Sequence, residues 1–310
     1  MTTRKIILDA DPGIDDAVAF AVLLQACKAQ LRLVVTTYGN VPLEKTTQNA
    51  RNLMALLDAS GVPIVRGAVQ PGEGSAVYED ASYIHGGDGL GGLQGGELLQ
   101  GLTLPAVQEG DALQAVYDAI VQAGEVDYIT LGPMTNLSAL IRRFPEVLPR
   151  LHQVITMGGG IGLGNVTEYA EFNFYCDAES AQHVLSVVPN LILAPIDITT
   201  QVAFTLPQIE AIGTAGTPVA KAMAAMLAVN HAQCVGCGEP GATMHDSTAV
   251  LAYLYPERFT FRNCGVRVEC ERERYGESSV TEGENVQLMS GADPAALLDI
   301  ITRSIVEYGK

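Results

Sequence analysis

Four aspartates placed directly behind the first apolar run are the feature that most constrains this chain. The run Lys5–Ala10 has the Ile- and Leu-rich character of a buried strand, and Asp9, Asp11, Asp15 and Asp16 fall within eight residues. A Pro-Gly pair between them forces a turn, and the last two aspartates open an amphipathic helix. Two carboxylates about 4 Å apart repel by about 4 kcal/mol at an effective dielectric of about 20. The group therefore needs a compensating cation, bound protons or wide separation.

Hard oxygen ligands at this density favour Ca²⁺ or Mg²⁺ over Zn²⁺. A single aspartate at a helix start is more often a cap, but capping does not explain the whole group, so we favour a metal site. An EF-hand loop beginning at Asp9 is excluded, because Ile14 and Phe20 stand where Gly and Glu are required. A haloacid-dehalogenase-like magnesium phosphatase also places Asp-x-Asp after a first strand. It remains an alternative, although Gly87-Asp88 lacks the context of that family's later acidic motif.

Apolar runs alternate with helical patterns along the rest of the chain. Predicted strands are Lys5–Ala10, Leu31–Thr37, Tyr128–Leu131, Gln153–Met157 and Leu191–Pro195, with a later strand-like stretch at Arg262–Arg272. Predicted helices are Asp15–Lys28, Leu43–Leu57, Ala112–Gln122, Asn136–Arg143, Ala178–Val187, Gln208–Ala228, His245–Leu254 and Pro294–Tyr308, and Gly86–Gly96 is a predicted loop. This order predicts a single α/β domain over residues 1–310, with a mostly parallel open sheet flanked by helices. The ligand site is expected at the carboxyl ends of the strands.

The composition and net charge of the chain disfavour some classes of binding partner. The chain has 310 residues, is 48% hydrophobic and carries a formal net charge of −17. Such a surface repels nucleic-acid backbones and anionic lipid, and no apolar run is long enough to cross a bilayer. The first residues enter a strand pattern without a signal-peptide core, so we expect a cytoplasmic protein with reduced cysteines. The Cys234–Cys237 pair has zinc-like spacing but no second pair, so we interpret it as structural.

Further polar fragments stand at strand ends or helix starts. They are Thr37-Tyr38-Gly39-Asn40, Leu131-Gly132-Pro133-Met134-Thr135-Asn136, Met157-Gly158-Gly159-Gly160, Asn165 to Asn173, and Thr243-Met244-His245-Asp246. Each alone is weak evidence, since Asn and Gly at strand ends are usually turn formers. Together, and in this order, they resemble the motifs of the inosine–uridine-type nucleoside hydrolases over residues 5 to about 254.

The resemblance implies a calcium-dependent ribonucleoside hydrolase that releases free base and ribose. It implies calcium ligands at Asp11, Asp16, Asp246 and the carbonyl of Leu131, with Asp11 as general base and His245 as leaving-group acid. It implies sugar contacts from Asp15, Asn40, Met157, Asn165, Glu171, Asn173 and Asp246, and a base-pocket position for His85. Asp9 is left without a ligand role and is expected to support the loop. The family is usually dimeric or tetrameric, so a homodimer or homotetramer is expected.

Two departures from the family pattern bear on specificity. Leu131 stands where the family has a hydroxyl residue. This difference does not weaken the predicted calcium site, because only the backbone carbonyl of this residue would bind the ion. The chain has no tryptophan, whereas the family's purine-specific branch stacks the base between tryptophans, so pyrimidine or mixed nucleosides are expected. Base-pocket residues are expected in the loops around His85 and within Asn230–Thr243. A third hypothesis is a protein that binds a nucleoside or ribose and calcium without catalysing a reaction. Under that hypothesis Asp11 would be unnecessary, because binding alone needs no general base.

Overall fold

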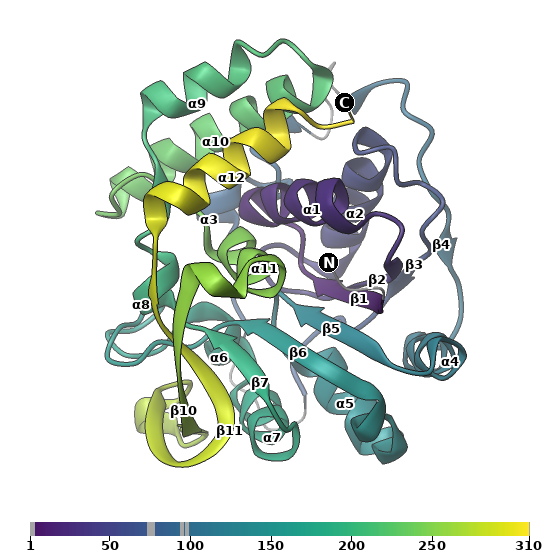
Figure 1. Cartoon of the computed structure of the whole chain (residues 1–310), viewed down its shortest axis with the longest axis vertical. Helices are drawn as coiled ribbons and strands as arrows, with labels where there is room; N and C mark the ends of the chain where they lie inside the picture. The colour runs from purple at the N-terminus through teal and green to yellow at the C-terminus, as the bar shows by residue number, and fades with distance from the viewer. Residues whose placement is uncertain (1–3, 73–77, 94–95, 97–98, 310) are drawn as a thin grey trace.

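A computed structural model describes residues 4–72, 78–93, 96 and 99–309, and Figure 1 shows their arrangement. Within these residues one nine-stranded sheet runs in the order β10-β11-β7-β6-β5-β1-β2-β3-β4, and β8 and β9 form a small separate pair. All neighbours in the large sheet are parallel except β10 and β11, which are antiparallel. The predicted α/β class, with a mostly parallel open sheet in a single domain, is confirmed.

The elements have the following bounds. The strands are β1 (Lys5–Ala10), β2 (Leu31–Thr36), β3 (Ile64–Arg66), β4 (Val107–Gln108), β5 (Val126–Thr130), β6 (Leu151–Met157), β7 (Leu191–Ala194), β8 (Ala203–Phe204), β9 (Ala242–Thr243), β10 (Phe259–Val268) and β11 (Ser278–Ala292). The helices are α1 (Ile14–Cys27), α2 (Leu43–Leu56), α3 (Ser82–His85), α4 (Ala112–Ala123), α5 (Thr135–Arg143), α6 (Phe172–Cys176), α7 (Ala178–Val187), α8 (Ile196–Thr199), α9 (Leu206–Gly213), α10 (Pro218–Gly236), α11 (His245–Leu254) and α12 (Pro294–Val306).

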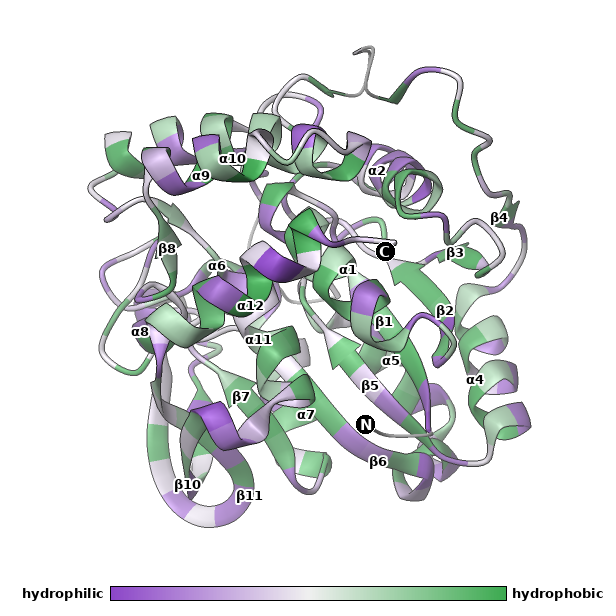
Figure 2. Cartoon of the chain, turned by 45° about the horizontal axis from the view of Figure 1, so that its top comes forward, coloured by the Kyte–Doolittle hydropathy of each residue, from purple (hydrophilic) through white to green (hydrophobic). Residues whose placement is uncertain are grey.

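The central strands of the sheet are buried on both faces, which explains why they are rich in Ile, Leu and Val. Along β1, Ile6 and Leu8 join one core and Ile7 joins the other, because successive side chains of a strand point to opposite faces. Helices α1, α2, α10, α11 and α12 cover the first face, and α4, α5 and α7 cover the second. Figure 2 shows the same layering, with apolar strands in the middle and polar residues on the outer sides of the helices.

Several predicted boundaries need correction. The helical stretch Gln208–Ala228 is two helices. The first ends at Gly213, Gly216 in the turn that follows has φ 78°, and Thr217 caps the second helix by accepting a bond from Ala220 N (3.1 Å). The predicted strand at Arg262–Arg272 begins earlier and ends at Val268. Strands β3, β4, β8, β9 and β11 and the short helices α3, α6 and α8 were not predicted. In the predicted loop Gly86–Gly96, residues 94–95 lie outside the described part of the chain, as do residues 1–3 and 310 of the predicted domain.

The helices of the described residues were also compared with the length and hydropathy that a bilayer requires. None of them is both long enough and apolar enough to cross a membrane.

Candidate active site

The segments that follow β1, β2, β5 and β6 meet the first turns of α1 and α11 at the carboxyl edge of the parallel strands, where ligands bind in open α/β sheets. A cavity of about 330 Å³ opens there. The predicted site residues that line it are Asp11, Asp15, Asn40, His85, Leu131, Met157, Asn165, Glu171, Asn173, His245 and Asp246. Asp16, the remaining predicted residue, is fully buried and does not line the cavity. The structure thus brings fragments from along most of the chain to one place.

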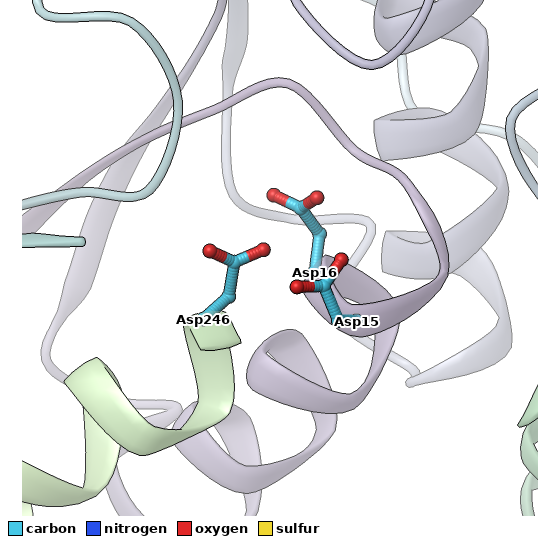
Figure 3. A group of neighbouring side chains, drawn as sticks. All are labelled: Asp15, Asp16 and Asp246. Carbon is cyan, nitrogen blue, oxygen red and sulfur yellow. The ribbon is translucent and has the colours of Figure 1, made fainter. Parts of the chain in front are cut away.

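Three carboxylates from two helices lie close together beside the cavity. Asp15 and Asp16 lie in the first turn of α1 and Asp246 lies in the first turn of α11, with one oxygen of each within 4.8 Å of the others (Figure 3). Asp16 Oδ2 accepts bonds from Gly13 N (2.8 Å) and Asn40 Nδ2 (3.1 Å). Its other oxygen, Oδ1, is buried and accepts no hydrogen bond from the residues that the structure describes. A buried carboxylate oxygen without a partner is costly unless a proton or a cation reaches it.

Burial and mutual repulsion both disfavour charge on these groups. Burial, and then Asp15, raise the pKa of Asp16 to about 7. Burial, and then the neighbouring aspartates, raise the pKa of Asp246 well above its usual range, and burial followed by Asp16 does the same for the pKa of Asp11. A divalent cation offsets both effects, and carboxylate and carbonyl oxygens are the ligands that Ca²⁺ and Mg²⁺ prefer. The residues present therefore fit a hard cation.

The carboxylate of Asp11 sits in a space that two glycines leave open. A Cβ at Gly39 would lie 1.9 Å from Asp11 Oδ2, and a Cβ at Gly132 would lie 2.4 Å from Asp11 Oδ1. The backbone N–H of Asn40 donates to Asp11 Oδ2 (2.7 Å). Asp11 lies outside the group joined within 4.8 Å, in which Asp15 stands instead. The predicted carboxylate ligands are Asp11, Asp16 and Asp246, whereas the three carboxylates within 4.8 Å of one another are those of Asp15, Asp16 and Asp246.

A side-chain amide links the ends of β5 and β6 on the opposite side of the cavity. Asn173 Nδ2 donates to the carbonyl oxygens of Leu131 (2.7 Å) and Met157 (3.2 Å). The Leu131 carbonyl is the one predicted to bind metal, and a carbonyl oxygen has a second lone pair available for a cation. The position of Asn173 therefore depends on both strand ends.

The two predicted contacts of the 5′-hydroxyl also organise the short helix α6. Glu171 accepts backbone bonds from Asn173 N (2.9 Å) through Oε1 and from Gly159 N (2.8 Å) and Phe174 N (3.1 Å) through Oε2. Burial raises the pKa of Glu171 to about 7. Asn165 Oδ1 accepts from Phe172 N (2.9 Å). Both side chains line the cavity, and both have a structural role as well.

Two histidines face the same cavity. His85 Nδ1 accepts from Ile14 N (3.1 Å), an otherwise free N–H at the start of α1, so the neutral ring carries its proton on Nε2. His245 Nδ1 lies 2.8 Å from the hydroxyl of Thr199. Burial lowers the pKa of His85 and that of His245, and for His245 the charges of Asp15 and Glu239 oppose this shift. Their ring nitrogens can therefore serve as directed donors to a ligand.

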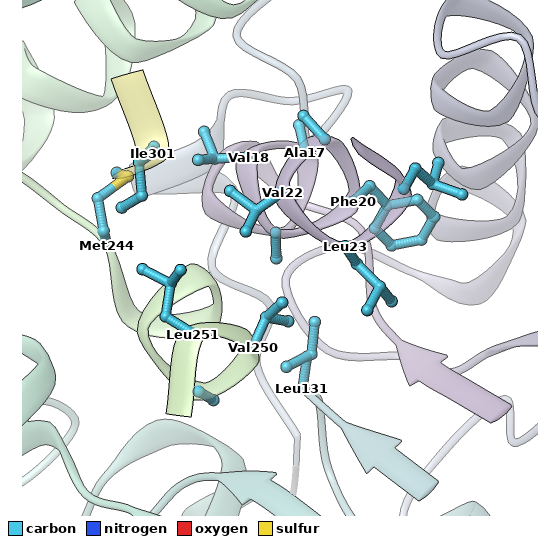
Figure 4. Close-up of a cluster of buried hydrophobic side chains, with 14 of the residues drawn as sticks. Ala17, Val18, Phe20, Val22, Leu23, Leu131, Met244, Val250, Leu251 and Ile301 are labelled. Carbon is cyan, nitrogen blue, oxygen red and sulfur yellow. The ribbon is translucent and has the colours of Figure 1, made fainter. Parts of the chain in front are cut away.

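Apolar packing fixes the two charged helix starts relative to each other. Figure 4 shows Val18 and Val22 of α1 beside Val250 and Leu251 of α11, and all four side chains are at most 1% exposed. Burying an aliphatic side chain of this size contributes about 2 kcal/mol. This contact offsets the repulsion between the carboxylates and holds Asp246 beside the first turn of α1.

Asp9 lies outside the cavity, as expected for a supporting residue. Its fully buried carboxylate accepts bonds from Tyr128 Oη (2.8 Å) and Asn136 Nδ2 (2.9 Å). Burial raises the pKa of Asp9 to about 7.

Part of the cavity wall comes from the segment that leads up to the motif at His245 and Asp246. It includes Asn230, Cys234, Cys237, Glu239 and Thr243, all from the segment in which base-pocket residues were expected. Residues up to Gly236 belong to α10 and are helical, so a loop was the wrong expectation for this part. The Cys234 thiol contacts Asn230 Oδ1 (3.5 Å) and Thr243 Oγ1 (3.7 Å). Among the described residues, no cysteine belongs to a metal-ligand group.

The chain was compared with protein families, curated proteins and solved structures. The family model "Inosine-uridine preferring nucleoside hydrolase" matches residues 6–299. The non-specific ribonucleoside hydrolase RihC of Salmonella schwarzengrund is 33% identical over 298 residues, covering 95% of this chain and 93% of the relative. A plant nucleoside hydrolase structure superposes with a TM-score of 0.88 at 25% identity, covering 98% and 99% of the two chains. A purine-preferring ribonucleoside hydrolase from Gardnerella vaginalis, at 24% identity and a TM-score of 0.88 over 98% and 99%, shares the fold.

The fold and the relatives define the class: this is a hydrolase that acts on N-glycosyl bonds. The chain belongs to the inosine–uridine preferring nucleoside hydrolase family. The phosphatase alternative is not favoured by these comparisons.

Proposed function

We propose that this enzyme hydrolyses the N-glycosidic bond of ribonucleosides with the help of one Ca²⁺ ion held at the start of α1 and α11. The observation that carries the proposal is the group Asp15, Asp16 and Asp246, whose oxygens lie within 4.8 Å of one another beside a cavity of about 330 Å³. The unpartnered Oδ1 of Asp16 supports a cation rather than a purely structural network. A cavity of this volume is within the range of small-molecule sites.

The resemblance and the geometry together suggest which residues hold the ion and the sugar. Asp11, Asp16, Asp246 and the carbonyl of Leu131 would hold the ion. The ribose 2′- and 3′-hydroxyls would be bound by Asp15, Asn173 and Asp246. The 5′-hydroxyl would be bound by Asn165 and Glu171. The remaining face of the sugar would contact Asn40 and Met157. When bound, Ca²⁺ would orient the diol and acidify a water molecule. Support for these roles is that all but Asp16 line the same cavity.

The protein's own groups would perform the remaining steps. Departure of the base leaves a positively charged, oxocarbenium-like ribosyl group, and the surrounding carboxylates stabilise that charge. Asp11, held by Asn40 N, would take the proton from the attacking water. His245 would donate a proton to the departing nitrogen, and His85 would contact the base through Nε2.

Three finer features are also proposed. Two observations support a pyrimidine or mixed preference that includes uridine, cytidine and inosine. The sequence contains no tryptophan, and the Salmonella relative is named as a non-specific ribonucleoside hydrolase. A cytoplasmic location and a homodimeric or homotetrameric assembly are proposed from the sequence and the family resemblance.

The test is a panel of nucleosides assayed for free base and ribose, with and without a calcium chelator. We expect release of uracil, cytosine or hypoxanthine that stops with chelator and returns with added Ca²⁺. Phosphate release from phosphomonoesters, or saturable nucleoside binding without turnover, would favour the phosphatase or the binding protein instead.

A further inference from the structure

A buried threonine, absent from every motif above, contacts the predicted leaving-group acid. Thr199 is the last residue of α8, is fully buried, and places Oγ1 2.8 Å from Nδ1 of His245. The two residues are 46 positions apart in the sequence. A hydroxyl in hydrogen-bond contact with one ring nitrogen constrains both the orientation of the imidazole and the position of its proton.

The backbone holds the two partners together at a second point. Three residues beyond Thr199, Val202 accepts a bond at its carbonyl oxygen from Met244 N (2.8 Å), directly before His245. The short pair β8–β9 continues this contact, with Ala203 opposite Thr243. The segments on either side of the hydroxyl–imidazole contact are therefore fixed, so the geometry does not depend on a mobile loop.

The chemical consequence concerns the other ring nitrogen. His245 lines the cavity, and with Nδ1 engaged by Thr199 the nitrogen left to meet a ligand is Nε2. In the neutral ring, a hydrogen bond donated by the threonine to Nδ1 requires the proton to reside on Nε2. A hydroxyl can also accept, so the same contact survives when Nδ1 carries a proton. Valine has nearly the same shape but can do neither.

We propose that Thr199 is a positioning residue that holds the His245 ring with Nε2 and its proton directed at the departing base. This inference rests on the proposed N-ribosyl hydrolysis. In that step His245 acts as the imidazolium, with Nδ1–H donated to Thr199 Oγ1. The electron pair of the C1′–N bond passes to the base nitrogen, which takes the proton from Nε2, while C1′ bonds the oxygen of the attacking water. The ring is left neutral with its proton on Nδ1. Nδ1 stays hydrogen-bonded to Thr199 throughout. Thr199 itself touches neither substrate nor metal.

The experiment compares Thr199→Val with Thr199→Ser on two kinds of substrate. Inosine and uridine have poor leaving groups that need protonation, whereas nitrophenyl riboside releases a stable anion that does not. General-acid catalysis contributes about 10²- to 10⁴-fold, so misdirecting the acid should lower kcat on nucleosides by about 10- to 100-fold with little change in KM. Hydrolysis of nitrophenyl riboside should change by less than about threefold, and Thr199→Ser should restore nucleoside turnover.

A matched control and a double-mutant cycle separate positioning from packing. Thr200→Val removes a neighbouring hydroxyl that donates to Ile196 O (2.6 Å) and should leave both activities unchanged. In a His245→Ala background, Thr199→Val should cost nothing further, because its effect passes through His245. Should Thr199→Val not fold, Thr199→Ala removes the hydroxyl without new bulk and is measured in the same way.

The possible results have distinct meanings. Equal losses on nucleosides and nitrophenyl riboside, or a full additional loss in the His245→Ala background, would overturn the role of Thr199 while leaving the proposed function intact. A wild-type enzyme that cleaves neither substrate would overturn the proposed function and this inference with it.

Discussion

Substituting Gly132 by alanine tests whether the position of Asp11 matters as the proposed mechanism requires. The added Cβ would lie 2.4 Å from Asp11 Oδ1, 2.8 Å from Asp11 Cγ and 3.0 Å from Thr37 Cγ2. Ordinary contacts begin at about 3.5 Å, so the carboxylate must move by about 1 Å. A displacement of that size at a reacting group costs about 10²-fold in rate. The overpacking itself should lower stability by about 1–3 kcal/mol.

The assay measures kcat and KM of Gly132→Ala on inosine and uridine with excess Ca²⁺, together with the melting temperature. We expect a folded protein with kcat lowered by about 100-fold. Gly61→Ala is the matched control, because a Cβ there would lie within 4 Å of none of the described atoms, and it should retain wild-type turnover. A folded Gly132→Ala variant with kcat close to that of the wild type would refute the reasoning that Asp11 must stay where the glycines allow it.

Three further predictions follow from the site. Asp11→Ala should retain the fold but lose several orders of magnitude in kcat, and near-normal turnover would remove Asp11 as the base. His245→Ala should slow inosine and uridine far more than nitrophenyl riboside, and equal losses would remove His245 as the acid. Burial raises the pKa of Glu171 from 4.5 to about 7, so the folded chain binds that proton more tightly than the unfolded chain and stability falls as pH rises between those values. The free energy of unfolding of the wild type and of Glu171→Gln is measured by urea titration with a chelator present. Between pH 4.5 and pH 7 the wild type should lose about 3 kcal/mol more than the variant. Equal changes in the two proteins over this pH range would contradict the raised pKa of Glu171.

Much of the fold could be predicted because its signals are local. The strands at the centre of the sheet, such as β1 and β6, are largely buried and rich in Ile, Leu and Val. Helices α7 and α11 begin and end where the sequence pattern predicts. The long strand β11 was missed, because its middle is polar and exposed and contains a glycine. Its pairing with β7 and β10 depends on tertiary contacts that no local pattern reports.

Part of the site could also be predicted from local sequence signals, and part of it depends on tertiary packing. Motif residues such as Asp11, Asn40 and Leu131 stand at or shortly after strand ends, so the parallel topology alone predicts that they meet. The place of Asp15 in the tightest carboxylate group depends on how α1 packs against α11. The contact between Thr199 and His245 joins two segments that carry no shared pattern. These features become visible only once the helices are placed.

Calcium titration of the metal-stripped enzyme, with turnover followed in parallel, tests the central claim most directly. We expect one Ca²⁺ per chain, with release of free base from uridine or inosine rising in proportion to the bound ion. The Asp16→Asn variant should show neither binding nor turnover under the same conditions. Full turnover by a wild-type enzyme that binds no calcium would contradict a metal-dependent mechanism built on Asp11, Asp16 and Asp246.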